Sequence, residues 1–223
     1  MNAGLKPGQE FERFRRVGIV AVASIPDASL AIPLAEALLR GGLDVLEITF
    51  RTTAAASAIE LVRNRFPEVY LGAGTVLSSA QADLAIAAGV DFLVAPGTNH
   101  AVVDRVVDRG KVMLPGICTP TELEAVMVKG IRLVKFFPAE PFGGVATIKA
   151  LAGPYPDARF VPTGGITPSN LPAYLAVEQV VACGGSWMVR ADLLRAGDWS
   201  TITRLASEAQ AIAAATRSGG RAA

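Results

Sequence analysis

The 223-residue sequence predicts an α/β protein, a (β/α)8 TIM barrel with an extra N-terminal helix. Short, continuously apolar runs, typical of strands covered on both faces, alternate with segments of helical period. This unit recurs at intervals of roughly 20–25 residues, which favours a closed parallel barrel. A doubly wound open sheet is the alternative. It requires a glycine-rich nucleotide turn after the first strand, and Ser24-Ile25-Pro26 stands there instead.

The elements follow from this alternation in chain order. A short amphipathic helix is expected at 10–16, before the first strand. The expected strands are residues 17–23, 43–49, 69–74, 91–95, 112–115, 131–136, 159–162 and 179–183. The expected helices include residues 54–65, 79–88, 101–109, 120–129, 144–151, 168–175 and about 200–215. No linker divides the chain, so we expect residues 1–223 to form a single domain, with 1–9 and 217–223 loose.

Composition limits the classes of function. Hydrophobic residues make up 51% of the chain and charged residues 18%, which supports a sizeable core and argues against disorder. A net charge of +1 offers no basis for binding nucleic acid or a membrane. Cys118, Cys183 and the single His100 lack metal-ligand spacing, so we expect neither a disulfide nor a metal site. A polar N-terminus and the lack of any bilayer-length apolar stretch predict a cytoplasmic protein.

Lys135 stands inside the apolar run at residues 133–137, which ends at Pro138. An ammonium group without water or a partner loses solvation, so burial favours the neutral amine. A neutral amine is a nucleophile whose natural target is a carbonyl carbon. The alternative is a lysine whose charged end reaches solvent from the end of the strand.

Glu47 and Arg51 lie at the end of the second expected strand. Strand alternation places Glu47, Thr49 and Arg51 on one face and the intervening apolar residues on the other, so the polar set should face the barrel interior. The second and sixth strands lie opposite each other in a ring of eight, so Glu47 and Lys135 should face one another across a small space. An internal Glu47–Arg51 ion pair is the alternative.

Other strand ends offer polar groups for a substrate. Thr75 provides a hydroxyl after the third strand, or caps the helix that follows. Two Gly-Gly turns, at Gly164-Gly165 and Gly184-Gly185, follow the seventh and eighth strands, the usual phosphate site of this fold. Ser186 would add a hydroxyl to that cradle, and Thr163 is a possible substrate contact. Ordinary tight turns are the alternative.

Six motifs in chain order resemble those of the 2-keto-3-deoxy-6-phosphogluconate (KDPG) and 4-hydroxy-2-oxoglutarate (KHG) aldolases. The motifs are Glu47-Ile-Thr-Phe-Arg51-Thr, Gly72-Ala-Gly-Thr75-Val, Pro115-Gly-Ile, Val134-Lys135-Phe-Phe-Pro-Ala-Glu140, Pro162-Thr-Gly-Gly-Ile and Gly184-Gly-Ser-Trp187. The resemblance implies a cytoplasmic, metal-independent class I lyase of carbohydrate metabolism (the Entner–Doudoroff pathway). It needs no cofactor and is typically a homotrimer.

The resemblance also implies a role for each residue. Lys135 would form a Schiff base with the substrate, and Glu47 would act as general acid and base. Arg51, Thr75 and Phe137 would hold the pyruvate portion, the first two at its carboxylate. The substrate phosphate would bind at the two turns, that is, at Gly164, Gly165, Gly185 and Ser186.

Three alternatives to KDPG cleavage stay open. A sibling aldolase would act on the galactonate-derived epimer or on a non-phosphorylated hydroxy-keto acid such as 4-hydroxy-2-oxoglutarate. A phosphate-binding barrel isomerase or synthase would not need the inward lysine. A phosphometabolite sensor would bind its ligand without consuming it.

Overall fold

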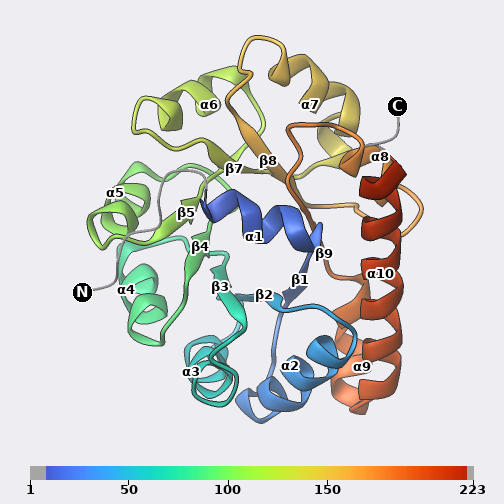
Figure 1. Cartoon of the computed structure of the whole chain (residues 1–223). Helices are drawn as coiled ribbons and strands as arrows, with labels where there is room; N and C mark the ends of the chain where they lie inside the picture. The colour runs from blue at the N-terminus through green and yellow to red at the C-terminus, as the bar shows by residue number, and fades with distance from the viewer. Residues whose placement is uncertain (1–8, 220–223) are drawn as a thin grey trace.

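The computed structural model describes residues 9–219. The protein has an α/β fold in which parallel strands form two curled sheets (Figure 1). The larger sheet has the order β5-β4-β3-β2-β1-β9 and the smaller one the order β6-β7-β8. The strands are β1 (Ile19–Ala23), β2 (Val45–Thr49), β3 (Tyr70–Gly74), β4 (Phe92–Val94), β5 (Val112–Leu114), β6 (Gly116–Ile117), β7 (Leu133–Phe136), β8 (Arg159–Pro162) and β9 (Cys183–Gly185).

Helices surround these strands, while α1 lies across the middle of the view in Figure 1. The α-helices are α1 (Gln9–Val17), α2 (Ala31–Arg40), α3 (Ala55–Arg65), α4 (Ser79–Ala87), α5 (His100–Asp108), α6 (Pro120–Met127), α7 (Gly144–Ala152), α8 (Leu171–Leu175), α9 (Ala191–Ala196) and α10 (Trp199–Gly219). Three 3-10 turns add η1 (Ala28–Leu30), η2 (Glu140–Phe142) and η3 (Trp187–Val189). Within residues 9–219 there is no helix with the length and apolar character needed to cross a bilayer.

The two sheets meet at both of their edges. Two isolated parallel bridges, Phe160 with Val180 and Thr163 with Gly184, link β8 to the segment that contains β9. At the other edge Pro115 alone separates β5 from β6. The strands therefore curl into a parallel arrangement with an inner and an outer face.

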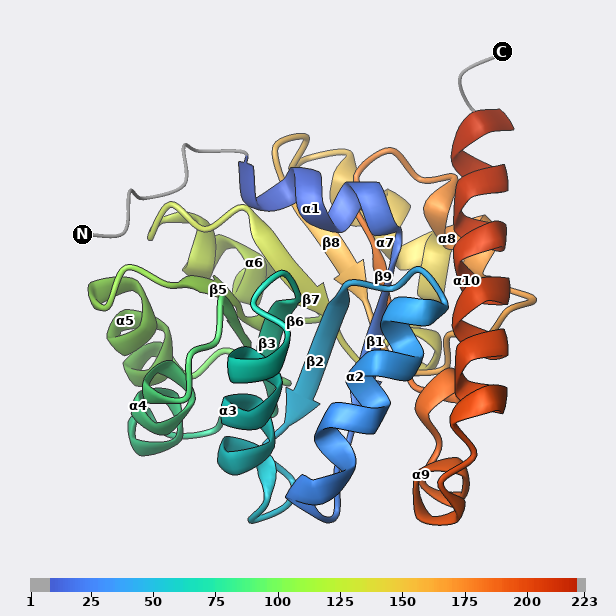
Figure 2. The ribbon, with the colours of Figure 1, turned by 60° about the horizontal axis from the view of Figure 1, so that its bottom comes forward.

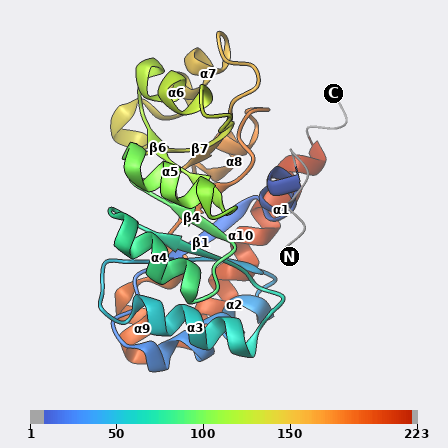
Figure 3. The same ribbon diagram turned by 90° about the vertical axis from the view of Figure 1, so that its left-hand side faces the viewer.

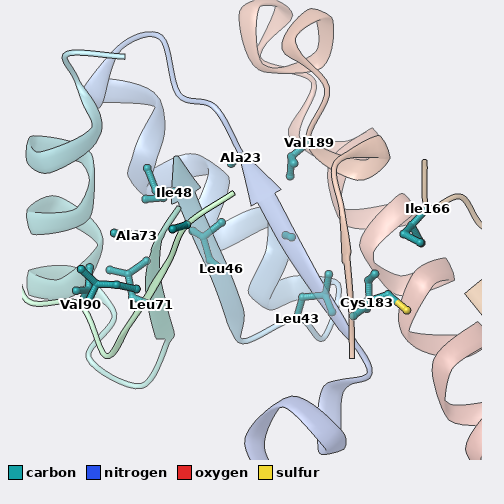
Figure 4. Close-up of a cluster of buried hydrophobic side chains, with 14 of the residues drawn as sticks. Ala23, Leu43, Leu46, Ile48, Leu71, Ala73, Val90, Ile166, Cys183 and Val189 are labelled. Carbon is teal, nitrogen blue, oxygen red and sulfur yellow. The ribbon is translucent and has the colours of Figure 1, made fainter. Parts of the chain in front are cut away.

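The outer core lies between the strands and the surrounding helices. Figure 4 shows part of it, including Leu46 and Ile48 of β2 and Leu71 and Ala73 of β3. Glycines allow close contact where neighbouring helices meet. A Cβ on Gly41, just after α2, would lie 2.5 Å from the Cβ of Ala206 in α10. The apolar runs of the sequence thus supply one continuous outer core.

The inner core lies inside the curled sheets and is a separate cluster of apolar side chains. Its strand residues include Val45, Phe92 and Leu133, and α1 contributes Phe14 and Val17. Figures 2 and 3 show α1 beside the C-terminal part of α10, at the end from which the strands start. Helix α1 therefore closes the amino-terminal end of the sheets, and the opposite, carboxyl-terminal end carries the polar strand ends.

The strand expectations differ from the structure mainly at the end of the chain. Each expected strand overlaps an observed one, but the eighth, at 179–183, overlaps β9 only at Cys183. The predicted turn at Gly184 and Gly185 is wrong, because these residues pair with Val20 and Ala21 of β1. The two-residue strand β6 was also missed, because Pro115 and Gly116, at its start, are typical of a turn.

The helix expectations were less accurate near the C-terminus. Helix α8 begins at Leu171, because Asn170 accepts a hydrogen bond from the backbone N–H of Thr167 and holds the preceding residues in a turn. The short α9 was missed. The expected loose tail at 217–223 was wrong for 217–219, which belong to α10. Gln9 is likewise helical, and the other loose segments, 1–8 and 220–223, lie outside the described residues.

Candidate active site

A buried acid–base pair lies inside the curled sheets. Lys135 of β7 and Glu47 of β2 are each 4% exposed, and the lysine Nζ is 3.5 Å from the Glu47 Oε1. No hydrogen bond satisfies that Oε1 within the described part of the chain. Two ionisable groups held this far from water, one of them with an unsatisfied oxygen, are typical of a reactive site rather than a stabilising ion pair.

Strand alternation explains why these two side chains meet. On β7, Leu133 belongs to the inner core and Val134 and Phe136 to the outer core, so Lys135 must project inward. On β2 the same rule places Val45 below Glu47 on the inner face. The pair therefore sits directly on the apolar inner core, one layer toward the carboxyl-terminal end.

Glycine at the neighbouring strand end makes space for the acid. A Cβ on Gly74 of β3 would lie 2.0 Å from Glu47 Oε1. No real Cβ approaches another atom that closely, so any larger residue at this position would displace the carboxylate. Gly74 thus helps to set the position of Glu47.

Arg51 and Thr75 form the next polar group toward solvent. The Arg51 Nε donates to the Thr75 Oγ1 at 3.1 Å. Thr75 is the single non-glycine residue with positive φ (56°) among residues 9–219, a conformation that costs energy and often marks a functional position. The alternatives for these residues were wrong, because Ser78 caps α4 and Glu47 pairs with Lys135 rather than Arg51.

Phe137 closes one side of the lysine. The Lys135 Nζ lies 5.3 Å from the centre of the Phe137 ring, within the range of a cation–π contact. The peptide bond between Phe137 and Pro138 is cis. The chain leaves the sheet at this point and continues into η2.

Of the two predicted glycine turns, one is present as expected. Gly164 (φ 99°) and Gly165 (φ 81°) follow β8 in the left-handed conformation that favours glycine. Thr163 precedes them, and its Oγ1 contacts the Val161 carbonyl at 3.4 Å. The helix expected at 168–175 starts later, because α8 begins only at Leu171.

The second predicted turn is a strand with a polar end. Gly184 and Gly185 are buried in β9, where a Cβ would lie 2.4 Å from the Thr163 Oγ1 or 2.0 Å from the Trp187 ring, respectively. These glycines therefore serve close packing rather than a turn. Only Ser186, exposed at the strand end before η3, remains available as a hydroxyl.

Comparison with known proteins places the chain in a family. The sequence model of the "KDPG and KHG aldolase" family matches residues 11–205. The chain belongs to this family. A 2-dehydro-3-deoxy-phosphogluconate aldolase of Treponema pallidum is 48% identical over 198 residues, covering 89% of this chain and 94% of that protein.

Solved structures of the family share the fold. A KDPG aldolase from Legionella pneumophila, with pyruvate captured as a covalent carbinolamine, has a TM-score of 0.87 and 37% identity over 91% of this chain and 98% of that one. A Zymomonas mobilis enzyme with 3-phosphoglycerate has a TM-score of 0.84 and 38% identity over 92% of this chain and 96% of that one.

Two features of this family member were not predicted as site residues. Thr49 is 1% exposed on the same inward row as Glu47, and its hydroxyl has no hydrogen-bond partner among the described residues. The alternation that located Glu47 also marks Thr49. The second feature is a hydrogen bond from the Tyr174 hydroxyl to Glu140, which no local pattern reveals because 34 residues separate them.

The remaining candidates do not join the site. His100 opens α5, with Asn99 as its cap. Burial raises the pKa of Cys183, and the pKa of Cys118 is raised by burial and by its contact with Glu122, so both thiols are poor nucleophiles. No group of three or more His, Cys, Asp or Glu side chains suited to a metal ion occurs in the described range 9–219.

Proposed function

We propose that this chain is a class I, Schiff-base aldolase that cleaves 2-keto-3-deoxy-6-phosphogluconate to pyruvate and glyceraldehyde 3-phosphate. The observation that carries the proposal is the buried Lys135–Glu47 pair, in a chain 48% identical to a named aldolase of that substrate. The carbinolamine captured in the Legionella enzyme supports a covalent route through an amine.

Catalysis begins with attack of the neutral Lys135 amine on the C2 ketone. The resulting carbinolamine loses water, with Glu47 supplying the proton, and becomes an iminium. Glu47, 3.5 Å from the lysine Nζ, can serve both steps directly or through one water.

Bond cleavage uses the iminium as an electron sink. Glu47 removes the C4 hydroxyl proton, the C3–C4 bond breaks, and its electron pair moves into the iminium to form an enamine. Glyceraldehyde 3-phosphate leaves at this stage. The enamine is then protonated at C3, and hydrolysis of the new iminium frees pyruvate and the lysine.

The surrounding residues would bind the two ends of the substrate. Arg51 and Thr75 would hold the carboxylate, supported by their mutual hydrogen bond at the carboxyl-terminal edge. The ring of Phe137 would pack against one side of the imine. The phosphate would lie against the backbone N–H groups of the Gly164-Gly165 turn and the Ser186 end of β9, with Gly185 and Thr163 as neighbours.

The whole chain would form one (β/α)8 barrel domain in which α1 is an additional helix. The bridges between β8 and the β9 segment, and the near-continuity of β5 with β6, support a closed ring. The family resemblance supports a homotrimer and a place in the Entner–Doudoroff pathway. A phosphorylated substrate favours a cytoplasmic location, which cell fractionation would test.

Covalent trapping tests the proposed chemistry. The protein is incubated with pyruvate, reduced with borohydride and digested, and the adduct is located by peptide mass. We expect modification at Lys135 alone and none in Lys135→Met. A wild-type protein without an adduct, or an adduct elsewhere, would refute the role of Lys135 and favour a phosphate-binding isomerase, synthase or sensor.

Cleavage of 4-hydroxy-2-oxoglutarate is the second candidate activity, because the matching family includes KHG aldolases. Comparing kcat/KM for this compound, for KDPG and for the galactonate-derived epimer assigns the preferred substrate. A preference for the phosphorylated gluconate series supports the proposal, whereas a preference for either of the other two replaces it.

A further inference from the structure

A pair formed by a tyrosine hydroxyl and a carboxylate lies beside the Gly164-Gly165 turn, the candidate phosphate site. The hydroxyl of Tyr174, in α8, donates to the Oε1 of Glu140, which begins η2 just after β7. Tyr174 is 1% exposed. A buried hydroxyl bonded to a carboxylate is a strong contact, and without the exposed Glu140 carboxylate the buried Tyr174 hydroxyl would lose this partner.

Glu140 also touches the Gly164-Gly165 turn directly. Its backbone N–H donates to the Gly164 carbonyl at 3.1 Å, and the preceding Ala139 N–H donates to the Thr163 carbonyl at 2.8 Å. A Cβ on Gly165 would lie 2.5 Å from the Glu140 Cγ. The turn after β8 is therefore held against the segment that leaves β7.

The same pair lies against the start of α7. A Cβ on Gly144 would lie 2.8 Å from the Tyr174 hydroxyl and 3.1 Å from the Glu140 Oε1. The hydrogen bond thus joins helix α8 to the segment that leaves β7, and the backbone hydrogen bonds of that same segment hold the turn after β8. Strand β7 also carries Lys135, so the contact relates the turn to the reactive lysine.

We propose that the Tyr174–Glu140 pair is a positioning device that holds the Gly164-Gly165 turn at a set distance from Lys135, and so selects substrates that end in a phosphate. This inference rests on the proposed function. Neither side chain enters the reaction itself. The pair fixes the backbone donors that would receive the phosphate, and a loose turn would bind a dianion less well.

The test is Tyr174→Phe, measured on KDPG and on the same sugar acid without its phosphate. We expect KM for KDPG to rise about tenfold, the effect of one lost hydrogen bond to a charged group, with little change in kcat. KM for the unphosphorylated acid should stay unchanged. Equal shifts in KM for both substrates, or no shift in either, would overturn the proposal.

Three further variants separate positioning from general loosening. Tyr155→Phe is the matched control, because its hydroxyl donates to Glu124 at 2.6 Å in an exposed pair, and it should leave both KM values unchanged. Glu140→Gln keeps an acceptor for the Tyr174 hydroxyl, so its KM for KDPG should stay near the wild-type value. Glu140→Ala should behave like Tyr174→Phe. A Glu140→Gln variant as impaired as Glu140→Ala would also contradict the positioning role.

Calorimetry with inorganic phosphate keeps this inference separate from the proposed function. Wild-type protein should bind phosphate about tenfold more tightly than Tyr174→Phe. If wild type binds phosphate in this way but cleaves no KDPG, the positioning role stands and the proposed reaction fails. If wild type cleaves KDPG and Tyr174→Phe binds phosphate equally well, the positioning role fails.

Discussion

Lys135 and Glu47 derive their chemistry from their surroundings more than from their types. Each is a charged residue in an apolar strand, and each projects toward the inside because its neighbours along the strand pack outward. Below them lies the apolar inner core, which keeps water from the pair. Strand alternation therefore brings both side chains to the inner face, where the Lys135 Nζ lies 3.5 Å from the Glu47 Oε1.

Replacing Glu47 by Gln tests the acid–base role. The amide keeps the shape of the side chain but cannot accept and return protons, so we expect kcat to fall roughly 10²–10⁴-fold. Circular dichroism and thermal unfolding should show an intact fold. Near-normal turnover by this variant would remove Glu47 from the mechanism.

Gly74→Ala tests whether the position of Glu47 matters. The added methyl would lie 2.0 Å from the Glu47 Oε1, so the carboxylate has to move and kcat/KM should fall by about tenfold or more. Gly97→Ala is the matched control, because a Cβ at Gly97 would have no atom within 4 Å. Equal activity in the two variants would show that the carboxylate tolerates displacement.

Helix termini provide stability at the scale of single elements. Helix α6 begins with a capping box, in which the Thr119 hydroxyl accepts from the Glu122 N–H and the Glu122 carboxylate accepts from the Thr119 N–H at 2.9 Å. The same carboxylate accepts from the Cys118 N–H at 2.8 Å. The motif secures the chain where it leaves β6, close to the reactive strand β7.

Glu122 should make stability depend on acid. Burial opposes its charge, but the hydrogen bonds from Cys118 and Thr119 outweigh burial and lower its pKa below 4.5. A lowered carboxyl pKa stabilises the folded state above the unfolded-state value, and this stabilisation is lost as pH falls through the folded-state value. Glu122→Gln should therefore cost about 1 kcal/mol at pH 7 and progressively less in acid.

Urea unfolding of Glu122→Gln between pH 7 and pH 3 checks this prediction. The exposed Glu60 of α3 offers a matched control, since Glu60→Gln removes a carboxylate from the surface. We expect the control to follow wild type at each pH. A constant difference between Glu122→Gln and wild type across the range would contradict the predicted linkage.

Helix α1 is an element with a structural task, to close the amino-terminal end of the inner core. Phe14 is fully buried and packs edge-on against Tyr70 and Phe92, with ring centres 5.6 and 5.1 Å away. Phe14→Ala should lower the free energy of unfolding by about 3–5 kcal/mol. Phe142→Ala, at a side chain 47% exposed, should cost far less, and similar losses would show that α1 is peripheral.

At the scale of the whole molecule, residues 9–219 form two apolar cores that lie on opposite faces of the curled sheets. The outer core attaches the helices, and the inner core, closed by α1, forms a floor below the reactive pair. Because the inner core already fills the interior, the residues at the carboxyl-terminal ends of the strands can be polar without a loss of core packing. Function can thus occupy one end of the strands while stability depends on the rest.

Assembly is a prediction at the same scale. If the proposed homotrimer forms, the particle should have three times the mass of the 23.2 kDa chain. Light scattering coupled to gel filtration measures that mass directly. A mass equal to one chain across the accessible concentrations would contradict the homotrimer.

Much of the fold could be predicted from local patterns. Apolar runs located the strands, and the polar residues that interrupt two of them, Glu47 and Lys135, marked the inner face of the sheets. The prediction failed at Gly184 and Gly185, which pair with Val20 and Ala21 of β1 and have no room for a side chain. Thr163, Val20 and Ala21 lie far from these glycines in the sequence, so the local pattern does not contain the pairing.

The sequence by itself determined which side chains face inward, because strand alternation is a property of consecutive residues. It also determined the family, through six motifs that occur in the same order along the chain. Only the tertiary structure decided between the two partners that the sequence left open for Glu47, which pairs with Lys135 and not with Arg51, and only it shows that Tyr174 reaches Glu140. Contacts between distant segments depend on how the strands curl and close, and that closure is a collective result of packing across the whole chain.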